Sequence, residues 1–199
     1  MTVAIIHTGC ANIYSVQAAL DRLGVEHSLA ATPPDAAIAD RLILPGVGSA
    51  LPAMTQLRAT GWAEALQREA RPLLGICLGM QLLFEGSDEG DVAGLGLIPG
   101  RVVPLAPFDG GVLPHMGWNT LVISAPVDPL LAGLGENDRA YFVHSFAAPV
   151  NDFTLAATMY GERFSAAVRS DNIMGCQFHP ERSGPVGARI LKNFLEVRP

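Results

Sequence analysis

Three short apolar segments in the first half of the chain, each followed by a helical pattern, constrain the fold most strongly. The segments are residues 3–6, 41–44 and 72–76. Runs of this length are typical of strands buried on both faces of a sheet. Asn12 is a candidate N-cap for the first helix, and Gly24 is placed to end it. Strands that alternate with helices predict βαβ units and a parallel sheet.

The second half of the chain has a different pattern, in which strand-like segments follow one another with turns between them. They are residues 98–104, 112–117, 139–146, 153–159, 164–169 and 173–178. We expect them to form an antiparallel or mixed extension of the same sheet, and residues 185–197 to form a closing helix. No repeat or linker divides the chain. The prediction is therefore one α/β domain over residues 1–199, with a central, mostly parallel sheet flanked by helices.

Composition narrows the classes of function. The 199 residues are 49% hydrophobic and 16% charged, which favours a folded core over disorder. The net charge is −6 and no basic cluster stands out, so we expect no nucleic-acid partner. No apolar run reaches a membrane span, and the first residues do not resemble a signal peptide. The three cysteines are Cys10, Cys77 and Cys176, a sparse and odd number that indicates reduced thiols and a cytoplasmic protein.

A candidate nucleophile stands where the third apolar strand should turn into a helix. Cys77 lies between Gly75 and Gly79 in the order Gly-Ile-Cys-Leu-Gly, the form of a nucleophile elbow. The glycines permit a tight turn, and a helix N-terminus behind Cys77 favours the thiolate. A small buried cysteine in a glycine-bounded turn is the alternative interpretation.

A candidate base and its partner stand near the other end of the chain. Pro180 directs His179 into an extended conformation, in which Glu181 projects to the same side as the histidine. The carboxylate can then bind one imidazole nitrogen and leave the other for a thiol, as in a Cys-His-Glu triad. A structural histidine at a strand end is the alternative.

Two further patterns bear on metals, cofactors and backbone donors. Cys176 and His179 have a C-x-x-H spacing, but a zinc site needs a second ligand pair that the sequence lacks, so we predict no metal. The glycine-rich residues 44–49 lack the Lys of a P-loop and the third Gly of a dinucleotide loop. We expect no cofactor. Backbone N–H groups of Val47 or Gly48, together with Leu78, are candidates for an oxyanion hole, although a plain turn is also consistent with these residues.

Taken together, these motifs resemble those of the class I (triad) glutamine amidotransferases. Residues 74–84 resemble the nucleophile motif of that family, residues 45–48 its oxyanion strand, and residues 177–181 its His-Glu motif. Within the family, Pro-His-Met-Gly-Trp-Asn at 114–119 and Tyr-Phe-Val-His-Ser-Phe at 141–146 are similar to motifs of the glutaminase subunits of imidazole glycerol phosphate synthases, which serve histidine biosynthesis. The resemblance spans essentially the whole chain.

The resemblance implies a role for each matching residue. Cys77 is the nucleophile, His179 the general base and then acid, and Glu181 its orienting partner. The resemblance also implies that the substrate glutamine is held by Gly46, Gln81, His144, Ser145 and Phe146. Glutamine is hydrolysed through a Cys thioester to glutamate and ammonia. The implied partner is a (β/α)8-barrel cyclase subunit, in a heterodimer that receives the ammonia.

The sequence departs from the expected family pattern at two places. It has His7-Thr8-Gly9 where Asp-Tyr-Gly is expected, and Arg182 where a Lys usually follows the His-Pro-Glu motif, while Asn12 matches. The departures bear on coupling to the partner and not on the triad. Two rival interpretations are the glutaminase component of another synthase (anthranilate, aminodeoxychorismate or pyridoxal phosphate synthesis) and a non-catalytic α/β binding module.

Overall fold

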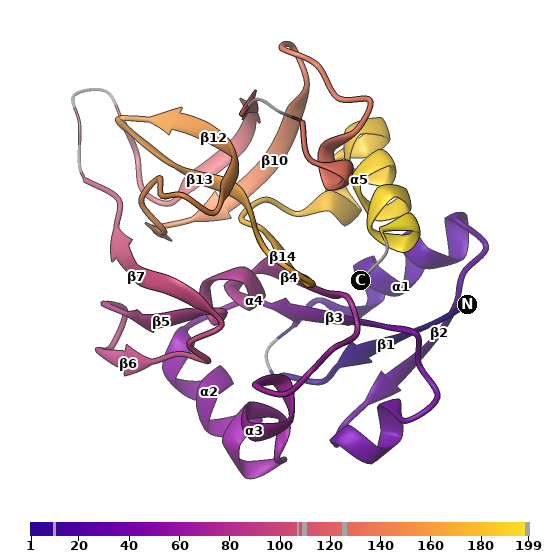
Figure 1. The fold of residues 1–199 in the computed structure, drawn as a ribbon. Helices are drawn as coiled ribbons and strands as arrows, with labels where there is room; N and C mark the ends of the chain where they lie inside the picture. The colour runs from indigo at the N-terminus through magenta and orange to yellow at the C-terminus, as the bar shows by residue number, and fades with distance from the viewer. Residues whose placement is uncertain (10, 107, 109–110, 125–126, 198–199) are drawn as a thin grey trace.

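The computed structural model describes residues 1–9, 11–106, 108, 111–124 and 127–197. Its centre is an eight-stranded sheet in the order β2-β1-β3-β4-β14-β13-β12-β9 (Figure 1). The strands are β1 (Thr2–Ile6), β2 (Glu26–Ala30), β3 (Arg41–Gly46), β4 (Leu73–Cys77), β9 (Val122–Ile123), β12 (Thr154–Tyr160), β13 (Glu162–Ser170) and β14 (Ile173–Cys176). The first five in spatial order are parallel to one another, and the pairings from β14 onward to β13, β12 and β9 are antiparallel. The predicted α/β class is confirmed.

Helices cover both faces of the parallel part of the sheet, as Figure 1 shows. On β1, Val3 and Ile5 point into the core that contains residues of α1 (Ile13–Arg22) and α5 (Gly184–Glu196). Their neighbours Ala4 and Ile6 point into the other core, beneath α2 (Ala50–Ala59) and α3 (Trp62–Leu66). Because successive strand residues face opposite sides, a continuous apolar run can supply both cores. The Asn12 side chain caps α1 by accepting from the backbone N–H of Ser15, as predicted.

The remaining strands form two smaller sheets, which corrects the expectation of one continuous extension. One sheet pairs β10 (Arg139–His144) with β8 (His115–Thr120), and the other has the order β11-β7-β5-β6. Its strands are β5 (Phe84–Ser87), β6 (Val92–Ala93), β7 (Ile98–Pro104) and β11 (Phe146–Ala147). The segment expected as one strand over 139–146 is broken at Ser145, because its two parts pair with different strands, β8 and β7.

Several predicted boundaries were wrong for identifiable reasons. The helix expected over 78–84 ends at Gln81 as α4 (Leu78–Gln81), because Phe84 is buried in β5 and pairs with Ile98. The strand expected over 112–117 begins only at His115, after Pro114, which has no N–H for a ladder. Strand β2 was missed because it is a largely exposed edge strand without an apolar run. Short 3-10 helices complete the fold: η1 (Pro33–Ala36), η2 (Pro129–Leu131) and η3 (Pro180–Arg182).

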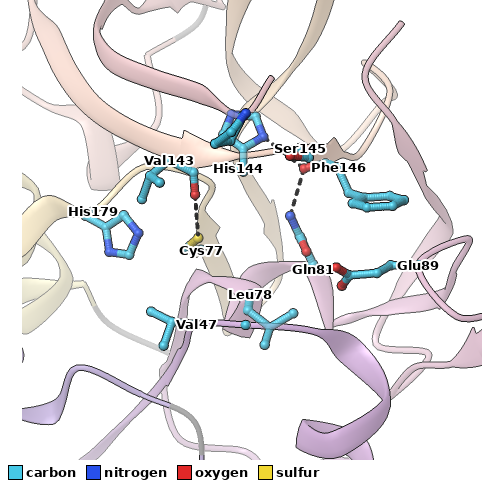
Figure 2. Close-up of a pocket in the computed structure, with 12 residues that line it drawn as sticks. Val47, Cys77, Leu78, Gln81, Glu89, Val143, His144, Ser145, Phe146 and His179 are labelled. Carbon is cyan, nitrogen blue, oxygen red and sulfur yellow. Dashed lines mark hydrogen bonds between the residues drawn. The ribbon is translucent and has the colours of Figure 1, made fainter. Parts of the chain in front are cut away.

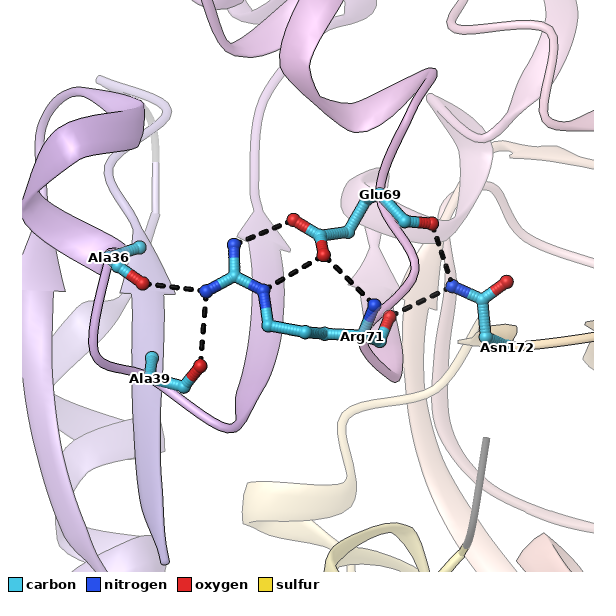
Figure 3. A network of polar contacts seen from close by, with 5 residues as sticks. All are labelled: Ala36, Ala39, Glu69, Arg71 and Asn172. Atoms are coloured by element: carbon cyan, nitrogen blue, oxygen red, sulfur yellow. Dashed lines mark hydrogen bonds and ion pairs between the residues drawn. The ribbon is translucent and has the colours of Figure 1, made fainter.

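The amino ends of β4 and β14 are joined by a polar network (Figure 3). The Arg71 guanidinium donates to both carboxylate oxygens of Glu69 at 2.8 and 2.7 Å, and to the carbonyl oxygens of Ala36 and Ala39 at 2.6 and 3.0 Å. The Asn172 amide donates to the carbonyls of Glu69 and Arg71. These contacts tie three separate loops to one end of the sheet.

Candidate active site

Cys77 lies at the carboxyl end of β4, at the turn into α4. Its backbone has φ +54° and ψ −111°, a conformation that is rare for a residue with a side chain. The turn depends on close backbone approach, since a Cβ on Gly79 would lie 1.7 Å from the Leu44 carbonyl oxygen. A Cβ on Gly75 would lie 2.7 Å from the Gly79 oxygen. The glycines predicted to permit a tight turn are therefore required by sterics on both sides of Cys77.

His179 and Glu181 follow β14, the strand beside β4. The imidazole Nδ1 of His179 lies 2.8 Å from Glu181 Oε1, and both side chains are buried. Two backbone contacts hold the turn: His179 N–H donates to the Tyr141 carbonyl, and the Ser183 hydroxyl donates to the His179 carbonyl. Within the described residues, His179 Nε2 and Glu181 Oε2 are buried without a hydrogen-bond partner.

Figure 2 shows the Cys77 sulfur beside the His179 ring. Burial by itself lowers the pKa of His179, but the influence of Cys77 and Glu181 outweighs burial and raises that pKa to about 10. The Cys77 thiol points to the Val143 carbonyl oxygen at 3.8 Å, and Gln177 Nε2 lies 3.8 Å from the sulfur. A thiol next to an imidazole that readily accepts a proton can supply a thiolate nucleophile.

A cavity of about 390 Å³ opens in front of the thiol. Most of the predicted site residues line it; the lining is Val47, Gly48, Cys77, Leu78, Gln81, Glu89, Pro114, Val143, His144, Ser145, Phe146 and His179. Gly46 lies behind Leu78, where a Cβ would come within 2.9 Å of the Leu78 Cβ, so its place is structural support of this wall. Glu181 lies behind His179 and is 2% exposed.

The sequence did not indicate three of the lining residues: Glu89, Pro114 and Val143. Glu89 lies in the turn after β5, and its Oε2 accepts from the N–H of Ala50 at 3.0 Å. No local motif marks it, because it is held at the cavity by a long-range contact with Ala50, 39 positions away in the sequence. Pro114 and Val143 belong to the segments 114–119 and 141–146, whose motifs marked them without indicating a place in the cavity.

The Gln81 side chain presents its oxygen to the cavity. Its Nε2 donates to the Phe146 carbonyl at 2.8 Å and to Gln177 Oε1 at 3.1 Å, so both amide hydrogens are used. In Figure 2 the Gln81 amide oxygen lies on the side of the Glu89 carboxylate. The two groups make this end of the cavity rich in hydrogen-bond acceptors.

The His144 ring is engaged on both nitrogens. Nδ1 lies 2.9 Å from the Phe146 carbonyl, and Nε2 lies 3.1 Å from Nδ1 of His115. Burial lowers the pKa of His115 to about 4 and, with the nearby charges of His115 and His179, lowers that of His144 to about 3. Both rings are neutral near pH 7, and both nitrogens of His144 are occupied within the protein.

The two departures from the expected pattern have definite places. The buried Thr8 hydroxyl donates to the Pro45 carbonyl at 3.2 Å, next to the glycine-rich loop. The Arg182 guanidinium lies over the Tyr141 ring at 5.5 Å from its centroid. Arg182 thus makes a cation–π contact with Tyr141.

Cys176 belongs to β14 and lies in the hydrophobic core, where burial raises the pKa of its thiol. Cys10 lies outside the described residues. Among the residues that the structure describes, no three His, Cys, Asp or Glu side chains are grouped as a metal site would require. No helix of the described chain has the length and apolar character needed to cross a membrane.

The family model and the curated relatives that match this chain agree with one another. Residues 4–197 match the family model "Glutamine amidotransferase class-I". The chain is 54% identical over 194 residues to "Imidazole glycerol phosphate synthase subunit HisH" of Xanthomonas campestris pv. campestris, covering 98% of this chain and 96% of that protein. The protein of the same name from Colwellia psychrerythraea is 46% identical over 208 residues, with 97% and 92% covered.

Solved structures share the fold at lower identity. A crystal structure titled as a glutamine amidotransferase superposes with a TM-score of 0.76 at 21% identity, covering 98% of this chain and 97% of that one. A chain in the structure of PurLQS from Thermotoga maritima has a TM-score of 0.72 at 20% identity, with 98% and 97% covered.

Proposed function

The chain belongs to the class I glutamine amidotransferase family, and from this premise we propose that it is the glutaminase subunit of an imidazole glycerol phosphate synthase. It hydrolyses glutamine to glutamate and ammonia and delivers the ammonia to a cyclase subunit. The observation that carries the proposal is the buried His179–Glu181 contact of 2.8 Å, which leaves His179 Nε2 without a partner beside a strained Cys77.

In the first half of the reaction, His179 Nε2 takes the thiol proton and the Cys77 sulfur attacks the side-chain carbonyl carbon of glutamine. A tetrahedral intermediate forms, and its oxygen carries the negative charge. His179 then gives the proton to the leaving nitrogen, the C–N bond breaks, and ammonia departs from a thioester. Glu181 keeps Nδ1 protonated and stabilises the imidazolium.

In the second half, water replaces ammonia at the same position. His179 accepts a proton from the water as it attacks the thioester, and the C–S bond breaks to release glutamate. The regenerated thiolate recovers its proton from His179. The same residue serves first as base and then as acid, because Cys77 and Glu181 favour its protonated form until the leaving nitrogen takes the proton.

The walls of the cavity suit the rest of the substrate. The acceptors Gln81 Oε1 and Glu89 are placed for the α-ammonium group, and the backbone of Ser145 and Phe146 for the α-carboxylate side. Backbone N–H groups of Val47, Gly48 and Leu78 are the candidate oxyanion donors. Gly48 has φ +86°, a conformation that glycine adopts without strain.

The proposed partner is a (β/α)8-barrel cyclase in a heterodimer. Relatives at 54% identity are named as a synthase subunit, which supports a partner, and the 114–119 segment supports this synthase over the other triad amidotransferases. Ammonia released without an acceptor is wasted and is mostly protonated at neutral pH. We therefore expect low glutaminase turnover for the chain alone and a rise of about a hundredfold with the cyclase and its nucleotide ligand.

One experiment separates an enzyme from a non-catalytic module. A glutamine-derived chloroketone should alkylate Cys77 stoichiometrically, with excess glutamine slowing the reaction, as read by mass spectrometry of the peptide that carries Cys77. Cys77→Ala is the control for labelling elsewhere. Labelling that glutamine does not slow would reject the proposed substrate, and co-purification with a synthase other than the cyclase would reject the proposed partner.

A further inference from the structure

A series of hydrogen bonds leads from the Phe146 carbonyl oxygen to the nucleophile, and this carbonyl sets the direction of each bond in it. A carbonyl can only accept, so the Gln81 amide must present its nitrogen there, at 2.8 Å. The second hydrogen of the same nitrogen is directed to Gln177 at 3.1 Å, which must therefore present its oxygen. The Gln177 nitrogen is left facing the Cys77 sulfur at 3.8 Å. One backbone acceptor thus determines the orientation of two side-chain amides.

A second set of contacts holds the same carbonyl from the other side. His144 Nδ1 donates to it at 2.9 Å, so Nε2 of the neutral His144 ring is an acceptor. This Nε2 accepts a hydrogen bond from Nδ1 of His115 at 3.1 Å. His115 Nε2 then accepts from the Asn119 amide at 3.2 Å, and that amide also donates to the Met159 carbonyl. The whole chain is consistent only with two neutral histidines that carry their protons on Nδ1.

We infer that Gln177 is a further catalytic residue: its side-chain amide is a hydrogen-bond donor to the sulfur of Cys77, and the Phe146 carbonyl sets its orientation through Gln81. The inference rests on the proposed role of Cys77 as the nucleophile. The motif that contains His179 and Glu181 begins with this glutamine, so one short segment supplies the base, its orienting carboxylate and a donor to the nucleophile.

The need for such a donor follows from what happens when the thiol proton leaves. Besides His179 and Gln177, the described structure places the Val143 carbonyl against the sulfur; it accepts the thiol hydrogen at 3.8 Å and becomes a repulsive neighbour of the thiolate. Gln177 is fully buried, so its amide is shielded from competing water. Its amide is a donor in either protonation state, and a hydrogen bond to a charged acceptor is stronger than one to a neutral acceptor. Gln177 therefore favours the thiolate.

The test is the pH dependence of Cys77 alkylation by iodoacetamide, which needs no glutamine and so stands apart from the proposed function. Cys77 is the sole cysteine between Arg68 and Arg101, so its tryptic peptide is separate from those of Cys10 and Cys176. Gln177→Met removes the donor with little change in size. Gln177→Glu keeps the shape but brings a negative charge. Gln67→Met, at an exposed position, is the matched control.

We expect Gln177→Met to raise the midpoint of the alkylation profile by about one pH unit, Gln177→Glu to raise it further, and Gln67→Met to leave it unchanged. For glutamine hydrolysis, kcat should fall about tenfold in Gln177→Met with little change in KM. A wild-type alkylation profile in a folded Gln177→Met or Gln177→Glu variant overturns the inference. If neither variant folds, the side-chain amide signals of Gln177 in the unaltered protein decide by NMR, because they must move with the ionisation of Cys77.

Discussion

The two ends of the parallel sheet each carry a buried or half-buried acid–base pair, and the pairs are arranged in opposite ways. At the amino ends of the strands, the Arg71 guanidinium has hydrogen bonds to Glu69 and to two backbone carbonyls. At the carboxyl ends, His179 and Glu181 share one contact, and each retains a polar atom without a partner in the described chain. The backbone of Cys77 beside them is strained.

The comparison shows a division of labour between the two ends of the sheet, with a stabilising pair at the amino ends of the strands and a reactive pair at the carboxyl ends. Ligand sites of open α/β sheets lie at the carboxyl ends of the strands, where loops can leave groups unpaired and aimed at a substrate. Burial raises the pKa of Glu69, but the hydrogen bonds and charge of Arg71 outweigh it, so the pKa stays below its ordinary value. That pair is permanently charged and structural. The His179 pair holds a proton that can be exchanged with Cys77, as an acid–base catalyst requires.

The largest expected effect is a loss of glutamine hydrolysis, from a substitution at the carboxyl ends of the strands. Cys77→Ala should lower glutamine hydrolysis by at least about 10³-fold, because no other group takes over the nucleophile's role. The free energy of unfolding should change by less than about 1 kcal/mol, since only one small side-chain atom is lost. Steady-state assays and urea unfolding measure the two quantities. The complex with the cyclase should still form product from free ammonia at alkaline pH, and loss of that reaction would show a wider structural defect.

The two members of the His179 pair should differ in effect. His179→Ala removes the group that transfers protons, whereas Glu181→Gln leaves an imidazole that is less well oriented. We expect the first to lower turnover about tenfold or more beyond the second, and the double variant to be strongly non-additive. Turnover of the three variants, corrected for folded fraction, provides the measurement. Strict additivity would mean that the two residues do not act as a unit.

The amino-end pair should show the reverse behaviour. Arg71→Met removes the guanidinium from Glu69, which keeps only the backbone N–H of residue 71, and from the carbonyls of Ala36 and Ala39, and should lower the free energy of unfolding by about 2 kcal/mol. Turnover per folded molecule should stay within about twofold of wild type, because the network lies at the opposite end of the strands. Arg68→Met, at an exposed position three residues earlier, is the matched control for urea unfolding. A fall in turnover without a fall in stability would contradict the division of labour.

The smallest effect concerns acid stability. The pKa values of His115 and His144 are lowered to about 4 and about 3, so the unfolded chain binds protons from about pH 6.5 downward while the folded chain does not. Stability should therefore fall as the pH falls from about 6.5 toward 4. His115→Phe keeps an aromatic ring between Phe142 and Tyr160 and should reduce this slope by up to about 1.4 kcal/mol per pH unit.

Urea unfolding of wild type and His115→Phe at half-unit steps of pH measures that difference. Among the described residues, the titratable neighbours of this pair are the two histidines themselves, Tyr160, which stacks on His115, and His179, whose charge acts on His144. Above about pH 8 the two proteins should have parallel stability profiles, because neither the folded nor the unfolded chain then protonates these histidines. Equal slopes between pH 6.5 and 5 would show that His115 titrates normally in the folded protein.

Much of the fold was predictable because its strongest determinants are local. The buried runs that became β1, β3 and β4, the Asn12 cap and the closing amphipathic helix α5 are marked by composition and spacing. The contact between His179 and Glu181 is also local, since only Pro180 lies between the partners, although Glu181 lies in the 3-10 helix η3 and not in the extended segment that was expected. In each case the residues that interact, or the pattern that buries them, lie within one element.

Other features depend on pairing between distant segments. Phe84 begins a strand and not a helical turn because it pairs with Ile98, and the chain breaks at Ser145 because β10 and β11 have different partners. Glu89 enters the cavity, and the Gln177 amide turns toward Cys77, only through such long-range contacts. The sequence by itself determined the alternation of strands and helices and the candidate triad. The tertiary structure alone decided the two small sheets, the cavity residues that were missed, and the orientation of the side-chain amides between Phe146 and Cys77. A hydrogen bond between residues about a hundred positions apart leaves no periodic signal in either segment.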